Sequence, residues 1–263
     1  MNSTVIYNKS IATDVHFLLR LKWSEKKIPT PGQFVMVSVS DASTSLDPLL
    51  RRPFSVFDAG KGWIELLYRV VGRGTSLMST LKKGDKVDVL GPLGKKFPTP
   101  KEKNKLIMVA GGIGIAPFYL LSKTLKNSKK DAVLFFGART KVDARLSAPI
   151  KKLGIKVKVS TEDGSLGRAG YVTDAVLDFI EKDSVIYACG PMGMLKATAK
   201  LAKDAGVLCY VSLESSMACG IGVCLGCALK ASEDVKKTKD KEYVLVCSEG
   251  PVFNSKDIEW EKL

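Results

Sequence analysis

Four cysteines in the last fifth of the chain have the spacing of ligands for a two-iron cluster. Cys219, Cys224 and Cys227 follow a C-x4-C-x2-C pattern, and Cys247 comes after nineteen further residues. This is the plant-type spacing, in which four thiolates hold a 2Fe–2S cluster. Glycines punctuate the loop, where they let backbone N–H groups approach the sulfur atoms. The pattern therefore predicts an iron–sulfur protein that moves single electrons.

Two other interpretations of these cysteines, a zinc site and disulfides, fit the sequence less well. A structural zinc site usually takes its ligands as two closely spaced pairs, whereas three of these cysteines crowd one loop. Disulfides are rare in the cytosol, and the polar residues 1–14 lack the apolar core of a signal peptide. We therefore expect a cytoplasmic protein with reduced thiols. A zinc-binding interaction module remains as an alternative from another class.

Length, composition and charge indicate a soluble protein of two or three domains. Of 263 residues, 45% are hydrophobic and 26% are charged, and no apolar run is long enough to span a bilayer. The formal net charge is +14, but the lysines are scattered and no nucleic-acid motif accompanies them. Neither nucleic acid nor a membrane is an expected partner. Solvated surface lysines are the main interpretation, and an acidic protein partner or anionic cofactors are the alternatives.

The chain has a single histidine, His16. This argues against histidine-based metal sites and against Ser–His or Cys–His catalysis. Its apolar neighbours alternate in the sequence, which predicts a strand residue. No catalytic acid–base residue is expected.

Residues 1–100 are expected to form an antiparallel β-barrel. Six short runs rich in β-forming residues are separated by turn signals, and closure into a barrel removes exposed strand edges. One helix is expected over Ser76–Leu81, with Thr75 as its N-cap and Gly84 beyond its end. The expected strands are Val5–Tyr7, His16–Leu21, Phe34–Val39, Pro53–Asp58, Trp63–Arg69 and Lys86–Leu90.

Residues 101–210 alternate between strands and helices, which predicts a doubly wound parallel α/β domain. The Pro- and Lys-rich stretch 94–104 marks the boundary with the barrel, and residues 210–214 lead into a small cysteine-rich subdomain over 211–263. The fold class is thus α+β and multi-domain. The expected strands are Lys105–Ala110, Val133–Gly137, Val157–Ser160 and Ser184–Ala188, and the expected helices are Pro117–Lys126, Ala144–Leu153, Thr173–Phe179 and Gly193–Ala205.

Two motifs in the barrel region fit a flavin dinucleotide. The stretch 52–55 combines a guanidinium for phosphate, an aromatic ring and a hydroxyl. The stretch 69–75 leads into a helix, whose N–H groups and dipole suit a diphosphate. Each motif alone is a common strand entry or turn, but together they predict an FAD site. Its expected residues are Arg52, Pro53, Phe54, Ser55, Arg69, Val70, Val71, Gly72, Gly74 and Thr75.

A second nucleotide site is expected where the parallel strands end. Ligands bind at the carboxyl ends of such strands, and a Gly-Gly-Ile-Gly turn follows the first one. A proline starts the next helix, where its missing N–H costs nothing. A nicotinamide nucleotide fits this crevice best. Its expected residues are Gly111, Gly112, Gly114, Pro117, Arg139, Asp163, Cys189, Gly190 and Pro191.

Some roles stay open at the level of the residues. Cys189 is either a buried structural thiol or a neighbour of the nicotinamide, whereas Cys209 is expected to be a packed strand residue. Arg139 could contact the 2′-phosphate of NADP, and Glu162 or Asp163 could instead disfavour it. The residues alone therefore do not decide between NAD and NADP.

Taken together, these motifs carry a resemblance to a superfamily and, within it, to one particular family. The nucleotide motifs resemble the ferredoxin–NADP reductase superfamily. The cysteine block resembles the electron-transfer subunits of NAD-dependent (class 1B) dihydroorotate dehydrogenases, and the likeness covers nearly the whole chain. Small subunits of ferredoxin:NADP and sulfide oxidoreductases are similar, but their first cluster ligand is typically an aspartate where this chain has Cys219. The segments that carry the resemblance are Arg52–Ser55, Gly72–Thr75, Gly111–Pro117, Cys189–Pro191, Ser215–Cys227 and Cys247–Phe253.

The resemblance implies an electron path shared with a partner. A subunit containing FMN would oxidise dihydroorotate to orotate in pyrimidine biosynthesis, and electrons would pass through the 2Fe–2S cluster and FAD to NAD+. The assembly would be a heterotetramer, with no dihydroorotate site on this chain. FAD must stand between the other two groups, because nicotinamide exchanges two electrons at once and the cluster one. We expect the cysteine loops at the subunit interface, with the basic charge helping to dock the partner.

Overall fold

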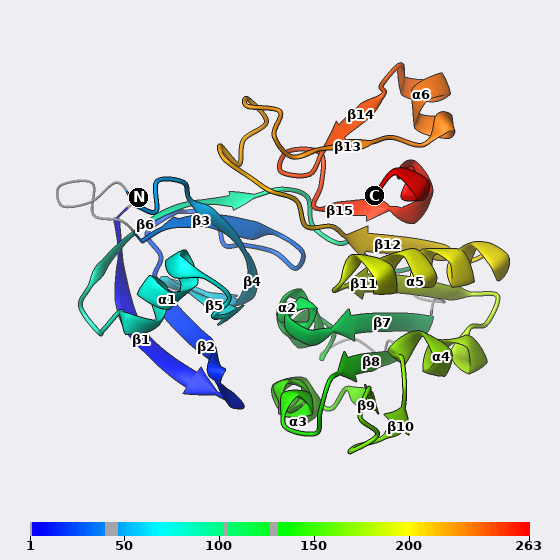
Figure 1. Cartoon of the computed structure of the whole chain (residues 1–263), viewed down its shortest axis with the longest axis horizontal. Coiled ribbons are helices and arrows are strands. Elements are labelled where there is room, and N and C mark those ends of the chain that lie inside the picture. The colour runs from blue at the N-terminus through cyan, green and yellow to red at the C-terminus, as the bar shows by residue number, and fades with distance from the viewer. Residues whose placement is uncertain (1, 40–46, 102–104, 127–130) are drawn as a thin grey trace.

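The computed structural model describes residues 2–39, 47–101, 105–126 and 131–263. It has three parts: a barrel, an α/β layer beside it, and a cysteine-rich part that contacts both (Figure 1). The expected boundary at 94–104 lies partly outside the described residues. None of the described helices is long and apolar enough to cross a membrane.

The N-terminal part is a closed antiparallel barrel, as expected. Its strand order is β1-β2-β5-β4-β3-β6, and alternate residues such as Leu19, Val56 and Leu66 are buried. The first two strands are longer than local composition indicates. Polar residues at both ends of β1 join it because they pair with β6 and β2. The strands are β1 (Asn2–Ile11), β2 (Thr13–Lys22), β3 (Phe34–Ser38), β4 (Arg52–Gly60), β5 (Trp63–Arg69) and β6 (Lys86–Leu93).

The helix in the barrel, α1 (Arg73–Thr80), begins earlier than expected. Its N-cap is Gly72, so the prediction of Thr75 as N-cap is wrong. The Thr75 hydroxyl instead reaches back and accepts hydrogen bonds from the N–H groups of Val71 and Gly72, at 2.9 and 3.1 Å. A threonine can satisfy such donors from the third helical position as well as from the cap. Arg73 and Gly74 are therefore helical rather than part of the preceding turn.

The α/β part is built on one seven-stranded sheet, with order β10-β9-β8-β7-β11-β12-β15. The pairs from β10 to β12 are parallel, and β15 joins β12 antiparallel. The four expected strands are confirmed. The strands are β7 (Lys105–Gly111), β8 (Ala132–Ala138), β9 (Lys156–Thr161), β10 (Arg168–Ala169), β11 (Ser184–Cys189), β12 (Leu208–Ser212) and β15 (Val252–Asn254).

Two of the four expected helices are only partly α-helical. The segment around 144–153 begins as the 3-10 turn η2 (Asp143–Ser147) and continues as α3 (Ala148–Lys152), because Pro149 has no N–H to donate to the preceding turn. The segment 173–179 is α4 (Val172–Val176) followed by η3 (Leu177–Phe179). The helices α2 (Ala116–Leu125) and α5 (Met192–Asp204) agree closely with expectation, and η1 (Gly112–Ile115) precedes α2.

The cysteine-rich part is inserted in the chain between β12 and β15, which are paired neighbours in the large sheet. It contains a two-stranded sheet of β13 (Ala228–Lys230) and β14 (Tyr243–Leu245), joined by α6 (Glu233–Lys239). The chain then returns through β15 to β12 and ends in η4 (Ser255–Asp257) and η5 (Trp260–Lys262). The expected limit at 210 falls inside β12. One buried core contains Cys227 and Cys247 together with Phe34 and Met36 of the barrel, so this part packs on both of the others.

Candidate functional site

The cysteine loop is folded so that backbone N–H groups face sulfur. Cys219 Sγ accepts hydrogen bonds from the N–H groups of Cys224 and Ile221, both at 3.4 Å. Gly220 and Gly222 make this turn with φ of 74° and 86°, a region that favours glycine. The two hydrogen bonds, that from Cys224 first, lower the pKa of the Cys219 thiol to about 6. The loop therefore favours the thiolate that a metal requires.

The other two predicted ligands form a buried pair. The sulfur atoms of Cys227 and Cys247 are 3.2 Å apart, and the N–H of Cys247 donates to Cys227 Sγ at 3.4 Å. Burial, and then the neighbouring Cys227 thiol, raise the pKa of Cys247 to about 11. Iron bound between the thiolates would offset that cost. The structure holds the four cysteines as two separate pairs, and among the described residues no group of three or more metal-binding side chains is gathered in one place. Two pairs of thiolates suit a cluster of two irons, in which each iron takes two thiolates.

The cysteine loop rests on the barrel next to the FAD motif. A Cβ atom at Gly220 would lie 2.6 Å from Cγ of Met36. Met36 is in β3, where it pairs directly with Pro53 of β4. Only the width of one strand therefore separates the cysteine loop from the motif 52–55. The sequence analysis missed Met36, because a continuously apolar strand gives no sign of which distant segment its residues touch.

The two FAD motifs meet at the start of α1. A Cβ atom at Gly74 would lie 2.6 Å from Nε of Arg52, so the guanidinium group crosses the first turn of the helix. This group also donates to the Leu50 carbonyl. First-turn N–H groups have no partner within their own helix. An arginine and a helix N-terminus at one place form the arrangement that binds a diphosphate.

The aromatic part of the FAD motif lies on the barrel wall. The Phe54 ring meets the Tyr68 ring edge-on, with centroids 6.0 Å apart. The Tyr68 hydroxyl donates to Asn8 at 3.1 Å, and burial raises the pKa of Tyr68 to about 12. Val71, two residues before α1, is 77% exposed. The half-buried Phe54 and the exposed Val71 provide apolar surface for a flat ring.

His16 is a strand residue, as predicted. It lies buried in β2, pairs with Arg69 of β5, and its Nδ1 is 2.6 Å from the Thr13 hydroxyl. Burial and the nearby Arg69 lower the pKa of His16. Arg69 itself is exposed at the end of β5, one residue before Val70.

Replacing Gly74 with alanine is expected to weaken FAD binding about tenfold, because the new methyl group displaces the Arg52 guanidinium (about 1.4 kcal/mol per factor of ten). Flavin fluorescence released during dialysis measures the change. Gly193→Ala in α5 is the matched control, since no atom lies within 4 Å of its Cβ position and it is outside the FAD motifs. Equal flavin loss from both variants would contradict the role of Arg52.

At the carboxyl ends of the parallel strands, two glycine loops pack closely against each other. They follow the neighbouring parallel strands β7 and β11. A Cβ atom at Gly114 would lie 2.4 Å from the Cys189 carbonyl oxygen, and one at Gly111 would lie 2.7 Å from Cδ of Pro191. Gly190 has a φ of 155°, and its own Cβ position is 2.8 Å from the Gly111 nitrogen. The absence of side chains here lets the backbone approach a nucleotide closely.

The next two strand ends are joined by backbone contact. The Asp163 N–H donates to the Arg139 carbonyl at 3.2 Å, and both side chains are exposed. The Asp163 carboxylate accepts hydrogen bonds from the Ser165 hydroxyl and N–H, at 2.6 and 3.0 Å, which lower its pKa. The structure therefore places Arg139 and Asp163 at one edge, beyond the glycine loops. Pro117 is buried in the first turn of α2.

Both cysteines outside the cluster are buried. Burial raises the pKa of Cys189 to about 12, and that of Cys209 likewise. Cys209 is a packed residue of β12, as expected. For Cys189, the structure supports the interpretation as a buried thiol, with its backbone rather than its sulfur at the nucleotide loop.

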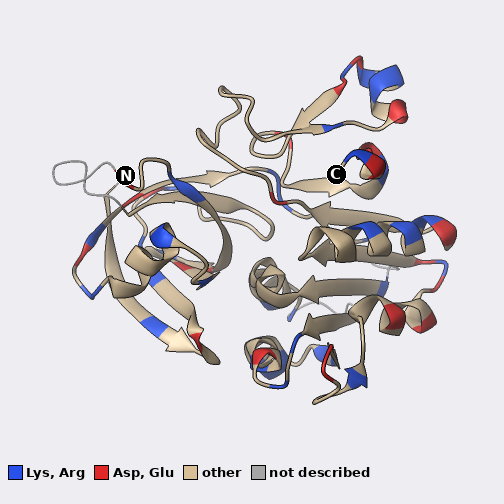
Figure 2. Cartoon of the chain, viewed as in Figure 1, with Lys and Arg blue, Asp and Glu red and all other residues tan. Residues whose placement is uncertain are grey.

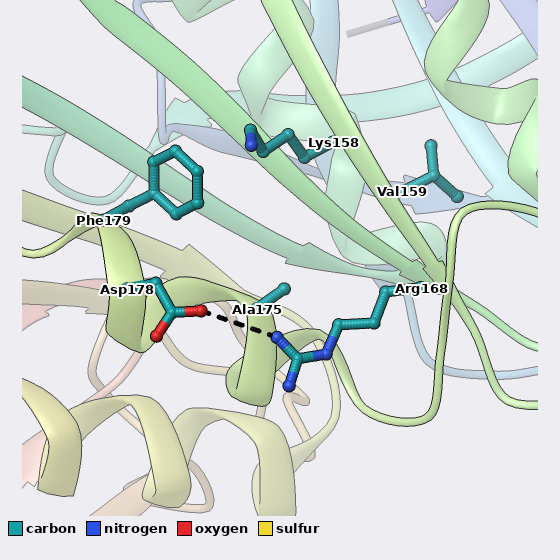
Figure 3. A pocket seen from close by; sticks show the side chains of 6 residues that line it. All are labelled: Lys158, Val159, Arg168, Ala175, Asp178 and Phe179. Atoms are coloured by element: carbon teal, nitrogen blue, oxygen red, sulfur yellow. Dashed lines mark ion pairs between the residues drawn. The ribbon is translucent and has the colours of Figure 1, made fainter.

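A hollow of about 310 Å³ lies away from these sites, between β9, β10, α4 and η3 (Figure 3). Its charged groups already have neighbours. Lys158 Nζ is 3.8 Å from the centre of the Phe179 ring, and Arg168 is 3.8 Å from Asp178. We assign this hollow no role.

Comparison with known proteins supports this description of the fold. The chain superimposes on an NADH-dependent reduced ferredoxin–NADP oxidoreductase, studied for flavin-based electron bifurcation, with a TM-score of 0.83. Sequence identity is 30%, over 99% of this chain and 91% of that one. A ferredoxin NADP+ reductase from Neisseria gonorrhoeae with bound FAD and NADP gives a TM-score of 0.67 at 17% identity, over 78% and 91%. Barrel and α/β domain thus define a reductase of the ferredoxin–NADP reductase fold.

Sequence comparison gives the particular family. The electron transfer subunits of dihydroorotate dehydrogenase B (NAD(+)) from Caldanaerobacter subterraneus and Fusobacterium nucleatum are 41% and 38% identical, each over 98% of both chains. The chain belongs to this family. Residues 214–259 match the iron-sulfur cluster binding domain of dihydroorotate dehydrogenase B, and residues 108–200 match an oxidoreductase NAD-binding domain. These matches favour the dihydroorotate assignment over the ferredoxin, sulfide and zinc alternatives.

Proposed function

We propose that this chain passes electrons between an FMN-containing catalytic partner, which oxidises dihydroorotate to orotate, and NAD+. The observation that carries the proposal is the contact of Gly220 in the cysteine loop with Met36, the strand partner of Pro53. This contact places the loop of the cluster ligands one strand away from the FAD motif. When bound, FAD exchanges a hydride with nicotinamide and single electrons with an iron–sulfur cluster.

The chain's own residues bind and orient these groups. Four cysteines hold the cluster, with backbone N–H groups donating to Cys219. Arg52 and the first turn of α1 bind the FAD diphosphate, and the loops at Gly114 and Gly190 seat the nucleotide. Hydride transfer depends on alignment of the two rings rather than on a strong base. No acid–base residue is therefore assigned.

NAD is the proposed nucleotide rather than NADP. The Asp163 carboxylate stands at the strand end beside Arg139 and is held in place by Ser165. A fixed negative charge at this edge would repel a 2′-phosphate. The relatives from Caldanaerobacter and Fusobacterium also carry NAD(+) in their names.

The cysteine loop is the proposed docking surface for the partner. Ile221, Val223 and Leu225 are 54%, 75% and 63% exposed, and residues 215–229 contain no charged side chain. Figure 2 shows lysines on α5 and α6, whereas the cysteine loop is free of charged colours. Exposed apolar side chains next to a cluster mark a protein interaction site. Docking at the loop itself is therefore apolar, and the basic charge expected to help lies elsewhere on the surface.

Introducing a charge into this loop is expected to break the complex. Val223→Glu should weaken partner binding at least about tenfold, because a carboxylate would be buried without a counter-ion. Size-exclusion chromatography of the co-expressed pair measures binding, and cluster absorbance checks that the loop is intact. Leu177→Glu is the control, since Leu177 is 55% exposed on η3 of the α/β part. Equal binding by both variants would contradict the assignment of the loop.

The assembly is proposed to be a cytoplasmic heterotetramer with two copies of each subunit. The need for reduced thiols in the cluster is consistent with that compartment. The native mass of the co-expressed complex tests the stoichiometry. Dihydroorotate-dependent reduction of NAD+ by that complex under anaerobic conditions tests the function. A pair that reduces NAD+ from ferredoxin or sulfide but not from dihydroorotate would overturn the proposal.

A further inference from the structure

The two elements that carry the cofactor loops also touch each other at their far ends. Strand β4 begins at Arg52 in the FAD motif and reaches Asp58 six residues later. Helix α2 follows the nucleotide loop and carries Lys123 near its end, about 10 Å along the helix from its start. Figure 1 shows β4 and α2 facing each other across the junction of the two parts, and they are in contact. Their contact therefore sets the orientation of the two loops.

An ion pair crosses this junction. Lys123 Nζ lies 2.8 and 3.1 Å from the two carboxylate oxygens of Asp58, whose side chain is only 6% exposed. The Ala59 N–H also donates to this carboxylate at 2.8 Å. A buried carboxylate needs a counter-charge, because desolvation otherwise makes its burial costly.

A second buried carboxylate, that of Glu65, lies beside Asp58 and increases the need for a positive charge from Lys123 of α2. Asp58 pairs across the strands with Glu65 of β5, which is also buried. Glu65 finds its partners within the barrel, in Arg20 at 3.3 Å and the Tyr7 hydroxyl. Asp58 instead meets a cation from the other domain. The negative charge of Asp58 is therefore compensated only when α2 places the Lys123 ammonium group against it.

An aromatic stack lies one helical turn away. The rings of Phe57 and Tyr119 are 4.3 Å apart at the centroids and inclined by 13°. Tyr119 and Lys123 are four residues apart and so share one face of α2. Two directional contacts on one face restrict both sliding and rotation of the helix over β4.

We propose that the Asp58–Lys123 ion pair and the Phe57–Tyr119 stack form a clamp that aims the nucleotide loop at the FAD motif. Lys123 is then a positioning residue for hydride transfer, although it touches neither cofactor loop. This inference rests on the proposed function, because it assumes FAD on the barrel and NAD on the α/β domain. A small error in alignment can cost a large factor in rate.

The test is the rate at which NADH bleaches the flavin absorbance of the anaerobic complex in stopped flow. Lys123→Met should lower the rate at saturating NADH about tenfold, with half-saturation within about twofold and with normal flavin and iron content. Lys123→Arg should restore the rate, because it renews the ion pair. Lys236→Met is the control, because the Lys236 side chain is 47% exposed, close to the 43% of Lys123, and its 3.4 Å pair with the exposed Glu242 is far from the junction, at α6.

A double variant separates positioning from stability. Lys123→Met leaves Asp58 buried without its cation, which should lower the melting temperature. In Asp58→Asn/Lys123→Met the charge is gone and the amide oxygen still accepts from Ala59. We expect the melting temperature to recover while the rate stays low. Recovery of the rate together with stability, or a wild-type rate in Lys123→Met, would overturn the clamp alone. A wild-type complex that NADH cannot reduce would overturn the proposed function as well.

Discussion

Cys224→Ser is expected to lose the 2Fe–2S cluster and to lower partner-linked turnover by on the order of 100-fold or more. Cys224 supplies one of four thiolates, and a hydroxyl is a much poorer iron ligand. Its side chain is exposed, so the substitution removes no core packing. NADH oxidation by an artificial acceptor such as ferricyanide should persist, because the FAD and nucleotide loops do not depend on this residue.

Iron content and visible absorbance measure the loss of the cluster. Comparison of partner-linked turnover with ferricyanide-linked NADH oxidation shows whether the defect is confined to the cluster. Cys209→Ala is the matched control, since Cys209 is a thiol packed in β12 and outside the ligand set. It should keep the iron and at most lower stability modestly. Retention of the cluster absorbance by Cys224→Ser would show that the ligand assignment is wrong.

Gly114→Ala is expected to slow NADH-dependent reduction of the flavin by about 100-fold. The added methyl group would lie 2.4 Å from the Cys189 carbonyl oxygen and 2.6 Å from the Gly190 Cα atom. Both are backbone atoms at the end of a buried strand, so neither can rotate away. The two nucleotide loops must separate, and the close approach of NADH to the flavin is lost. Stopped-flow reduction by NADH gives the rate.

Reduction from the other side distinguishes this effect from misfolding. Dihydroorotate should still bleach the flavin and cluster of the Gly114→Ala complex, because that path does not use the nucleotide loops. Gly193→Ala is the control, since no atom lies within 4 Å of its Cβ position. Normal NADH reduction in Gly114→Ala would contradict the assignment of this turn.

Much of the fold is encoded locally and could be predicted. The cysteine spacing, the strand–turn–helix run at Gly111–Pro117 and the alternation after residue 105 each depend on neighbouring residues. Pro149, which splits one expected helix, was also a readable signal. The early start of α1 could not be predicted, because it depends on the hydrogen bonds that the Thr75 hydroxyl accepts from the N–H groups of Val71 and Gly72.

The contacts that join the parts could not be read from the sequence. The short strand β15 exists because it pairs with β12, forty residues earlier in the chain. Met36 against Gly220 and Lys123 against Asp58 are likewise contacts between distant segments. Local patterns specify which face of a strand or helix is buried, but not which partner covers it. The candidate site was therefore predictable as separate motifs, and its assembly came from the structure.

The central claim is that one chain joins an iron–sulfur cluster, FAD and NADH. The most direct measurement is the visible spectrum of the anaerobically purified chain before and after addition of NADH. We predict flavin bands together with broad 2Fe–2S absorbance, and bleaching of both by NADH. A colourless protein that retains zinc, or a coloured one that NADH does not bleach, would contradict this account.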